Sequence, residues 1–288
     1  MSMDSITSSQ QGGLLEGSVF TAPFRRISGF RVKVPVFVDV DHFTVKSADT
    51  DDEVNEALRL RYEVFYRELM GKKNFFGIDL DRFDQISDHL ILIDRTTDSV
   101  VGTYRLNSSQ HSRKFYSSHE FNISNVLKQP GVKLELGRAC VSRNYRSANM
   151  IGILWMGLLQ YIQTIGARYL FGCSSVNTAD FMRIAIIHRY LREFHYSSEE
   201  TRVHPVGKYR IRDLAGYLRQ ISRSRDFGDW QAEKGMIPSL LNSYLQAGAK
   251  ICGEPAFDRS FQCADFFTLL DFSSLNQNYV NGRMDHKA

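Results

Sequence analysis

The sequence has few of the features that would place it in a specialised class. Its four cysteines lie far apart, with no Cys-x-x-Cys pair and no histidine at zinc-binding spacing, which argues against a disulfide scaffold and predicts no metal site. The net charge is only +4, from 36 lysines and arginines against 32 acids, whereas dedicated nucleic-acid binders are usually strongly basic. We therefore expect a globular protein with reduced thiols and no nucleic-acid partner.

The sequence also lacks a long hydrophobic run. The most apolar window, residues 150–165, is interrupted by Gln160, Gln163 and Thr164, so it is too short and too polar at one end to span a bilayer. The polar N-terminal residues have neither the basic nor the apolar part of a signal peptide. We expect a cytoplasmic protein, with peripheral contact at the inner face of the cytoplasmic membrane left open as an alternative.

Hydrophobic periodicity in the first part of the chain predicts strands and one helix. Apolar residues alternate over 30–45, which predicts a strand. Thr50 and Glu53 have the spacing of a capping box at the start of a helix. Residues 88–94 and 99–106 then read as two strands joined by a turn.

The second part predicts a unit with parallel strands. Strands at 134–141 and 168–173 flank a helix at 149–166, which is the order of a βαβ unit. Another helix is expected to reach about residue 194, and three closing strands follow, at 250–252, 256–261 and 264–272. The pattern predicts an α/β protein of the α+β type, with a mixed sheet.

We expect one domain. Residues 1–28 are predicted to form a flexible tail, 29–275 the domain, and 276–288 a C-terminal tail. A basic insertion is expected at about 197–234, because this stretch is rich in arginine and poor in apolar periodicity. It is either a solvated face or a docking surface for an acidic protein or an anionic membrane.

Two charged features stand out before residue 90. Arg61 lies on the apolar stripe of its helix, where it either extends to the surface along its aliphatic stem or binds a carboxylate inside. The acidic run 79–84, followed by Asp88 and His89, lacks the spacing of a calcium loop. It is either a solvated loop or a group of carboxylates that receives a substrate ammonium, and we favour the second interpretation.

The segment Glu135–Val141 carries charge within an expected strand. Glu135 and Arg138 are three residues apart and should face opposite sides of that strand, so each would need a partner if buried. The basic loop that follows leads directly into a helix, an arrangement suited to an anionic ligand.

Several motifs together resemble the Gcn5-related N-acyltransferase superfamily: LRYEVFYRE (60–68), DLDRFD with DHL (79–90), VVGTYRL (100–106), ELGRACV with NYR (135–146) and the segment 237–267. More closely, the sequence resembles the ornithine-lipid type, hemolysin-like N-acyltransferases, which are related to acyl-homoserine lactone synthases. The resemblance implies a mostly antiparallel central sheet with flanking helices.

The resemblance also implies a reaction. A (3-hydroxy)fatty acyl group would pass from acyl carrier protein to the α-amine of an amino acid, with ornithine favoured, giving a lyso-aminolipid precursor. The amine would attack the thioester directly, so we expect no bound cofactor and no acyl-cysteine at Cys140; the acyl-phosphopantetheine thioester is a co-substrate. Where the superfamily usually has glycines, Arg146 is followed by Ser147, Ala148 and Asn149, which favours the carrier protein over coenzyme A.

Roles for individual residues follow from the same resemblance. Glu135 is the expected general base or amine-positioning group, with His89 as second choice. The expected acyl and phosphopantetheine-binding residues are Arg138, Ala139, Cys140, Val141, Arg143, Arg146 and Ser147. The expected acceptor-binding residues are Arg61, Asp81, Asp84 and Arg105, and the first three are expected to order the loop that covers the acceptor.

Two other functions stay open from the sequence. One is synthesis of a diffusible N-acyl amino acid or homoserine lactone signal. The other is a non-catalytic module that binds acyl carrier protein or a membrane.

Overall fold

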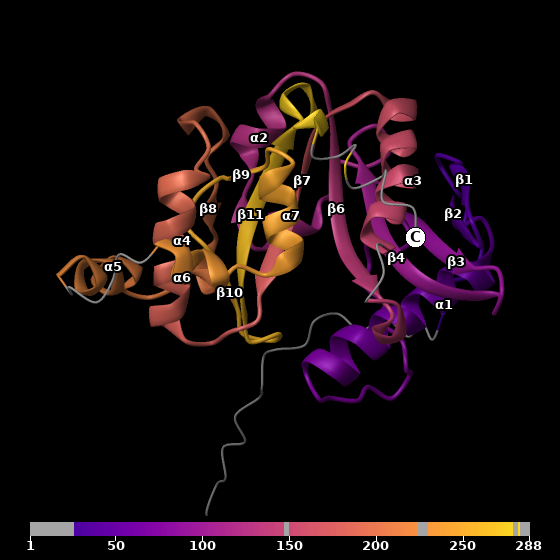
Figure 1. Ribbon diagram of the computed structural model, residues 1–288, viewed down its shortest axis with the longest axis horizontal. Coiled ribbons are helices and arrows are strands. Elements are labelled where there is room, and N and C mark those ends of the chain that lie inside the picture. The colour runs from indigo at the N-terminus through magenta and orange to yellow at the C-terminus, as the bar shows by residue number, and fades with distance from the viewer. Residues whose placement is uncertain (1–25, 147–149, 224–229, 279–281, 283–288) are drawn as a thin grey trace, which may run out of the picture.

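The computed structural model describes residues 26–146, 150–223, 230–278 and 282. Its centre is a nine-stranded sheet (Figure 1). Its order is β1-β2-β3-β4-β6-β7-β11-β10, with β9 beside β11. The strands are β1 (Phe37–Val40), β2 (Phe43–Ser47), β3 (Asp88–Asp94), β4 (Ser99–Ser108), β6 (Val132–Val141), β7 (Ala167–Val176), β9 (Lys250–Ile251), β10 (Ala256–Asp258) and β11 (Cys263–Asp271). Only the pair β6–β7 is parallel within this described sheet. The predicted mixed, mostly antiparallel sheet is confirmed.

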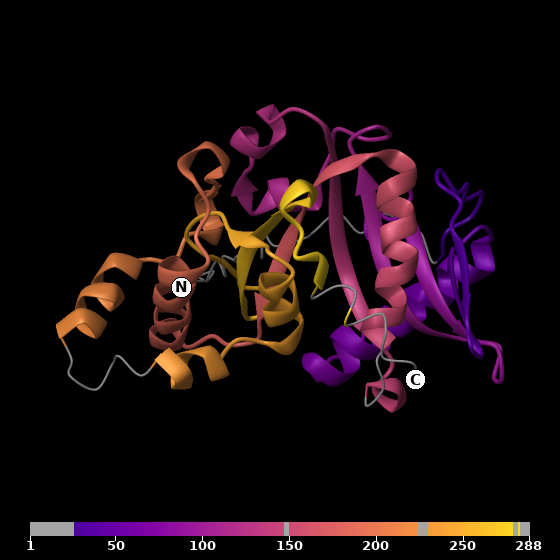
Figure 2. The ribbon, with the colours of Figure 1, turned by 45° about the horizontal axis from the view of Figure 1, so that its top comes forward.

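Helices cover both faces of the sheet (Figures 1 and 2). They are α1 (Asp51–Arg61), α2 (Ser124–Lys128), α3 (Met150–Ile165), α4 (Phe181–Phe194), α5 (Leu214–Arg223), α6 (Trp230–Gly235) and α7 (Ser239–Gln246). A π-helical segment, η1 (Tyr62–Leu69), continues α1, and a 3₁₀ turn, η2 (Tyr116–His119), precedes a small separate sheet of β5 (Phe121–Asn122) and β8 (His204–Pro205). Among these helices, none combines the length and apolar composition needed to cross a bilayer.

Alternation along the strands sorts the core into two faces. Leu90 and Leu92 of β3 pack with α3, whereas Ile91 between them packs with α1. In β11, Leu270 belongs to the cluster around α3, while Phe267 and Leu269 join a cluster on the other side. We call the two sides the α3 face and the α1 face. Successive side chains of a strand point to opposite faces.

Several expected elements are present. The hairpin β3–β4, the βαβ unit β6–α3–β7 and the closing strands β9, β10 and β11 are confirmed. Thr50 caps α1 by accepting a hydrogen bond from the backbone N–H of Glu53 at 3.2 Å. The reciprocal bond of a capping box is displaced by one residue, because Glu53 accepts from the backbone N–H of Asp49.

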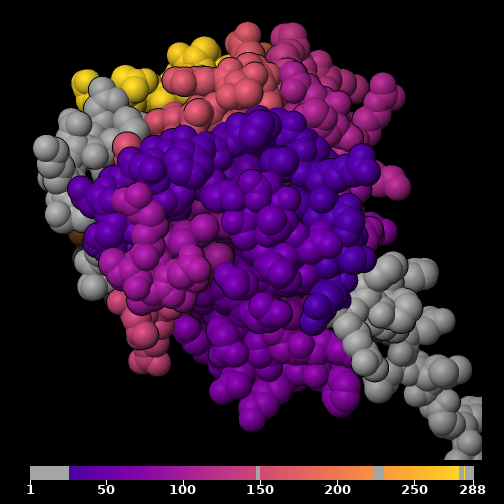
Figure 3. Space-filling model, turned by 90° about the vertical axis from the view of Figure 1, so that its right-hand side faces the viewer, coloured from indigo at the N-terminus to yellow at the C-terminus, as the bar shows by residue number. Residues whose placement is uncertain are grey.

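The single strand expected over 30–45 is wrong. The chain turns back at Asp41, whose φ of 51° is left-handed, so β1 and β2 form a hairpin. Aspartate tolerates this conformation better than most residues, and alternation continues through both strands, which hid the turn. The hairpin lies at one edge of the sheet, where early residues of the chain, in indigo, cover much of the surface (Figure 3).

Candidate active site

The site begins where β6 and β7 part. Their parallel pairing runs from Val132 with Ala167 to Glu135 with Phe171 and ends there. The next residue of β7, Gly172, comes so close to β6 that a Cβ atom on it would lie 2.2 Å from the carbonyl oxygen of Leu136. A cavity of about 330 Å³ occupies the space beyond this contact. The edge of β6 beyond Glu135 is therefore free of β7 and faces the cavity.

One half of the cavity is apolar and lies on the α3 face. Trp155 of α3 stacks on Tyr244 of α7, with ring centroids 6.1 Å apart, and the hydroxyls of Tyr244 and Tyr104 are 2.9 Å apart. Further apolar wall residues on this side include Leu136, Leu158, Leu159, Ile162, Leu170, Leu241 and Leu270. This half suits an alkyl chain, because burial of methylene groups is favourable in proportion to the area removed from water.

The other half is polar and lies on the α1 face. Its wall includes Arg105, Tyr116, Glu120, Glu135, Arg138, Asp258 and Asp265. The strand residues among them alternate with apolar residues that point to the α3 face, such as Tyr104, Leu106 and Leu134. The cavity therefore crosses the sheet, with an apolar compartment on one side and a charged compartment on the other.

The acidic run 79–84 is neutralised by arginines. Arg61 donates from Nε to Asp79 at 2.8 Å and from Nη1 to Asp84 at 2.7 Å. Arg105 donates from Nη1 to Asp81 at 2.7 Å and to Asp84 at 3.0 Å. The alternative in which these acids receive a substrate ammonium is therefore wrong, because their oxygens already bind guanidinium groups.

The pKa of Asp84 is consistent with a network in which the aspartates are ionised and paired with arginines. Burial by itself raises the pKa of the Asp84 carboxyl, but the charges of Arg61 and Arg105 outweigh it and hold that pKa well below its usual range. Arg138 joins the network from β6, with Nε 3.1 Å from Asp79 and Nη2 3.3 Å from Asp81. Three arginines and three aspartates thus brace the loop before β3.

Only part of this network reaches the cavity. Arg105 and Arg138 line it, but Arg61 and Asp84 are fully buried behind them. Direct acceptor contact by Arg61, Asp81 or Asp84 has no support, because none of the three lines the cavity. Their expected role in ordering the loop agrees with the ion pairs described above.

His89 does not have the geometry of a base. Its side chain is fully buried, its Nε2 atom lies 3.0 Å from the carbonyl oxygen of Asp84, and it does not line the cavity. Burial lowers the pKa of the imidazole to about 4. The second-choice base is therefore corrected to a buried, neutral histidine.

Glu135 lines the cavity, but its carboxylate is occupied. One oxygen accepts hydrogen bonds from the backbone N–H and the hydroxyl of Ser117, and the other accepts from the backbone N–H of Tyr116 at 2.8 Å. Burial raises the pKa of Glu135 and these hydrogen bonds oppose the rise. The contacts favour positioning of η2 over proton transfer, and the role of base stays a prediction.

Of the residues expected to bind the acyl-phosphopantetheine arm, some line the cavity and others are buried outside its wall. Ala139 lines the cavity next to Arg138, whose φ of 52° marks an irregularity in the pairing of β4 with β6. Arg138 itself is held by Asp79 and Asp81 on the α1 face, and its contact with the phosphate stays a prediction. Cys140 and Val141 are buried outside the cavity wall.

The basic loop after β6 is only partly described. Arg143 is exposed, and Arg146 binds Glu68 of η1 at 2.8 Å while its Nε donates to the carbonyl of Val141. Ser147 lies outside the described residues. Burial raises the pKa of the Cys140 thiol to about 12, so this cysteine is a poor nucleophile.

One group of wall residues was not anticipated from the sequence. Glu120, Asp258 and Asp265 come from distant segments, and their carboxylate oxygens lie within 4.8 Å of one another. A signal was present for two of them, since Asp258 and Asp265 interrupt the apolar stretches of two expected strands. A buried acid in such a stretch needs a partner.

Comparison with known proteins is consistent with an acyl-transfer site. Residues 60–156 match the family described as acetyltransferase (GNAT) domain. The chain is 29% identical over 255 residues to an L-ornithine N(alpha)-acyltransferase of Brucella abortus, covering 82% of this chain and 87% of that protein. It is 28% identical to the enzyme of the same name from Rhodobacter capsulatus, covering 82% and 93%.

Two solved structures resemble the chain at lower identity. One is the coenzyme A-dependent acyl-homoserine lactone synthase BjaI, at 13% identity and a TM-score of 0.45, covering 81% of this chain and 82% of that one. The other is FeeM, an N-acyl amino acid synthase from uncultured soil microbes, at 11% identity and a TM-score of 0.44, covering 83% and 93%.

Proposed function

We propose that this chain, an acyltransferase with a GNAT domain and with L-ornithine N(alpha)-acyltransferases as relatives, transfers a fatty acyl group from acyl carrier protein to the α-amine of ornithine. The observation that carries the proposal is the cavity that crosses the sheet where β6 and β7 part. It offers an apolar compartment for the acyl chain and a charged compartment for an amino acid, with the free edge of β6 between them.

The proposed step is aminolysis of the thioester. The α-amine, having lost a proton, attacks the thioester carbonyl carbon; a C–N bond forms, the C–S bond breaks, and the phosphopantetheine thiol leaves with a proton. Backbone N–H groups at the free edge of β6 would stabilise the developing oxyanion. Arg105 and Arg138, which line the cavity, would bind the α-carboxylate with N–H groups that the aspartates leave unused, because forked guanidinium donors suit carboxylates.

Direct attack of the amine on the thioester is consistent with a protonated Cys173 thiol. Cys173 lines the cavity, but burial and the nearby acids Glu120 and Asp265 hold the pKa of its thiol well above the usual value. A thiol that stays protonated is a weak nucleophile, so an acyl-cysteine intermediate has no support in this geometry.

The test is an assay with the full chain and defined donors. Incubation with 3-hydroxyacyl carrier protein and ornithine is expected to release free thiol and to yield N-acyl-ornithine by mass spectrometry. If folded protein gives no N-acyl product with any amino acid, the proposal is wrong. If acyl-coenzyme A serves as well as the acyl carrier protein, only the choice of donor is wrong.

Membrane contact is a further part of this proposal. The loop after η1 exposes Phe75 by 91% and Phe76 by 49%, next to the exposed Lys72 and Lys73. Asn74 holds the loop by accepting from the backbone N–H groups of Phe76 and Gly77. Aromatic rings beside lysines suit the surface of an anionic bilayer, and the product would be an amphiphile.

Replacement of both rings in Phe75→Ser/Phe76→Ser is expected to lower binding to vesicles that contain phosphatidylglycerol, because the inserted apolar area is lost. Cosedimentation measures the effect. Phe37→Ser removes an exposed ring from β1 at the edge of the sheet and serves as the matched control. Equal binding of the double variant and the control would contradict the role of the loop.

A further inference from the structure

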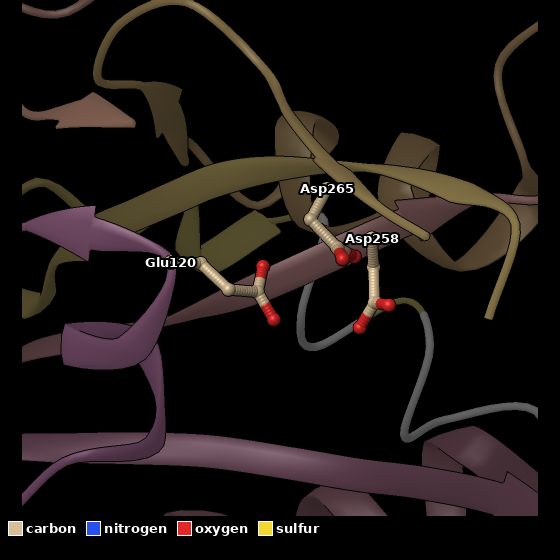
Figure 4. A group of neighbouring side chains, drawn as sticks. All are labelled: Glu120, Asp258 and Asp265. Carbon is tan, nitrogen blue, oxygen red and sulfur yellow. The ribbon is translucent and has the colours of Figure 1, made fainter. Parts of the chain in front are cut away.

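Three buried carboxyl groups meet in the charged compartment (Figure 4). Glu120 follows η2, Asp258 ends β10, and Asp265 lies on β11; their exposures are 1%, 6% and 3%. All three line the cavity, together with Arg105 and Arg138. We call Glu120, Asp258 and Asp265 the carboxylate trio.

The trio differs from the arginine-bound acids because its charge is not balanced. Burial, followed by the charge of Asp265, raises the pKa of Glu120 to about 10. Burial also raises the pKa of Asp265. In contrast, arginines lower the pKa of Asp84. The raised pKa values of Glu120 and Asp265 mean that this compartment disfavours their ionised forms, which a bound cation would stabilise.

Two members of the trio are oriented by donors outside it, and the third, Glu120, has one oxygen without a partner. Asp258 Oδ1 accepts from the backbone N–H groups of Ser260 and Phe261, at 2.6 and 3.1 Å, and Asp265 Oδ1 accepts from the hydroxyl of Ser175. The Oε2 atom of Glu120 is buried and accepts no hydrogen bond. A buried acceptor without a partner is costly, so this atom points to a donor that the ligand brings.

We infer that the carboxylate trio binds the side-chain ammonium of the acceptor and thereby selects a diamino acid. The inference rests on the proposed function, since it assigns the far end of the same substrate. An ammonium group has three N–H donors and no acceptor, which matches three convergent carboxylate groups. Ion pairing would offset the desolvation of the carboxylates.

Tyr116 sets the distance between the two ends of the substrate. The guanidinium of Arg138 lies over its ring, 4.9 Å from the centroid, and Tyr116 lines the cavity together with Glu120. Glu135 fixes the backbone of Tyr116 at 2.8 Å. An α-carboxylate at Arg138 and a side-chain ammonium at the trio would thus lie on either side of one positioned ring.

A divalent metal ion is the competing occupant. Calcium takes six to eight oxygen ligands, and magnesium takes six in a strict octahedron. The trio offers three carboxyl groups; one oxygen of Asp258 is committed to backbone donors, and the oxygens of Asp265 accept from the Ser175 hydroxyl and, at 3.7 Å, from the Cys263 thiol. The geometry therefore favours an ammonium group.

The test compares ornithine with norvaline, which has the same carbon chain without the second amine. For the wild-type chain, kcat/KM is expected to be about a hundredfold higher with ornithine, because norvaline brings no ammonium group to pair with the trio. Glu120→Gln and Asp265→Asn are expected to remove most of this preference while turnover of norvaline is retained. Asp271→Asn is the control: it lies on β11 outside the cavity wall, paired with Arg168.

Binding without an acyl donor gives a second, independent measurement. Calorimetry in buffers of different ionisation enthalpy is expected to show tighter binding of ornithine than of norvaline and release of a proton from Glu120. That release is expected to be absent in Glu120→Gln.

Each contrary outcome has its own meaning. Equal binding of ornithine and norvaline by the wild-type chain overturns the inference and leaves acyl transfer intact. An equal fall of kcat/KM for ornithine and for norvaline in Glu120→Gln also overturns the inference, because the trio would then act on the α-amine that both amino acids share. A stoichiometric metal whose removal abolishes turnover overturns it as well. Absence of any acylation, with ornithine still bound preferentially, contradicts the proposed function alone.

Discussion

Replacement of Asp84 by asparagine is expected to lower the free energy of unfolding by about 3–5 kcal/mol, the usual effect of removing one partner from a buried ion pair. Asp84 is fully buried and binds Arg61 and Arg105, at 2.7 and 3.0 Å. The amide would leave two guanidinium groups with less than their full counter-charge. Urea unfolding at pH 7 measures the change.

The control for Asp84→Asn is Glu63→Gln. Glu63 pairs with Arg67 on η1 at 4.0 Å, and both side chains are about half exposed, so its loss is expected to cost less than about 1 kcal/mol. If Asp84→Asn were as stable as this control, the arginine network would not support the fold in the way we describe.

The stability difference between wild type and Asp84→Asn is expected to depend on pH, because the pKa of Asp84 is lowered in the folded protein. The folded-state pKa of Asp84 lies well below that of the unfolded chain, because arginine charges outweigh burial. Its stabilisation is therefore fully present above the unfolded value of about 4 and is lost as the pH falls further. The difference in stability between wild type and Asp84→Asn is expected to shrink below about pH 4.

Replacement of Gly172 by alanine is expected to lower kcat roughly 100-fold, as displacements of about 1 Å at a reacting centre can do. The new Cβ would lie 2.2 Å from the carbonyl oxygen of Leu136. Because this neighbour is backbone, β6 and β7 must move apart at the point where the thioester is proposed to lie.

The control for Gly172→Ala is Gly235→Ala, at the end of α6, where a Cβ meets no atom within 4 Å. Thermal unfolding separates loss of fold from loss of activity, since overpacking typically costs about 1–3 kcal/mol. Unchanged kcat in a folded Gly172→Ala protein would show that the parting of the strands does not position the donor.

Local patterns predicted elements whose neighbours in the sheet are near in sequence. The hairpin β3–β4 and the unit β6–α3–β7 are of this kind. The sequence pattern does not reveal the turn at Asp41, because alternation of apolar residues continues on both sides of it. A periodic pattern reports burial and says little about chain reversal.

The site was harder to predict because its contacts join distant segments. The run 79–84 looked available for an amine because the sequence cannot show that Arg105 and Arg138 lie against it. The carboxylate trio escaped notice for the same reason, since Glu120 is far from Asp258 and Asp265 along the chain. Whether a buried acid pairs with an arginine or can bind a ligand depends on its neighbours in space, and these are set by tertiary packing.

The wall of the cavity has a composite origin. Segment 60–156, which matches the acetyltransferase domain, supplies Arg105, Glu120, Glu135 and the free edge of β6. Asp258, Asp265 and the α7 part of the apolar compartment come from the later chain. The carboxylate trio thus combines Glu120 from the matched segment with two residues from the later chain. Substitutions after residue 230 would therefore change the walls of both compartments and leave the sequence of the free edge of β6 as it is.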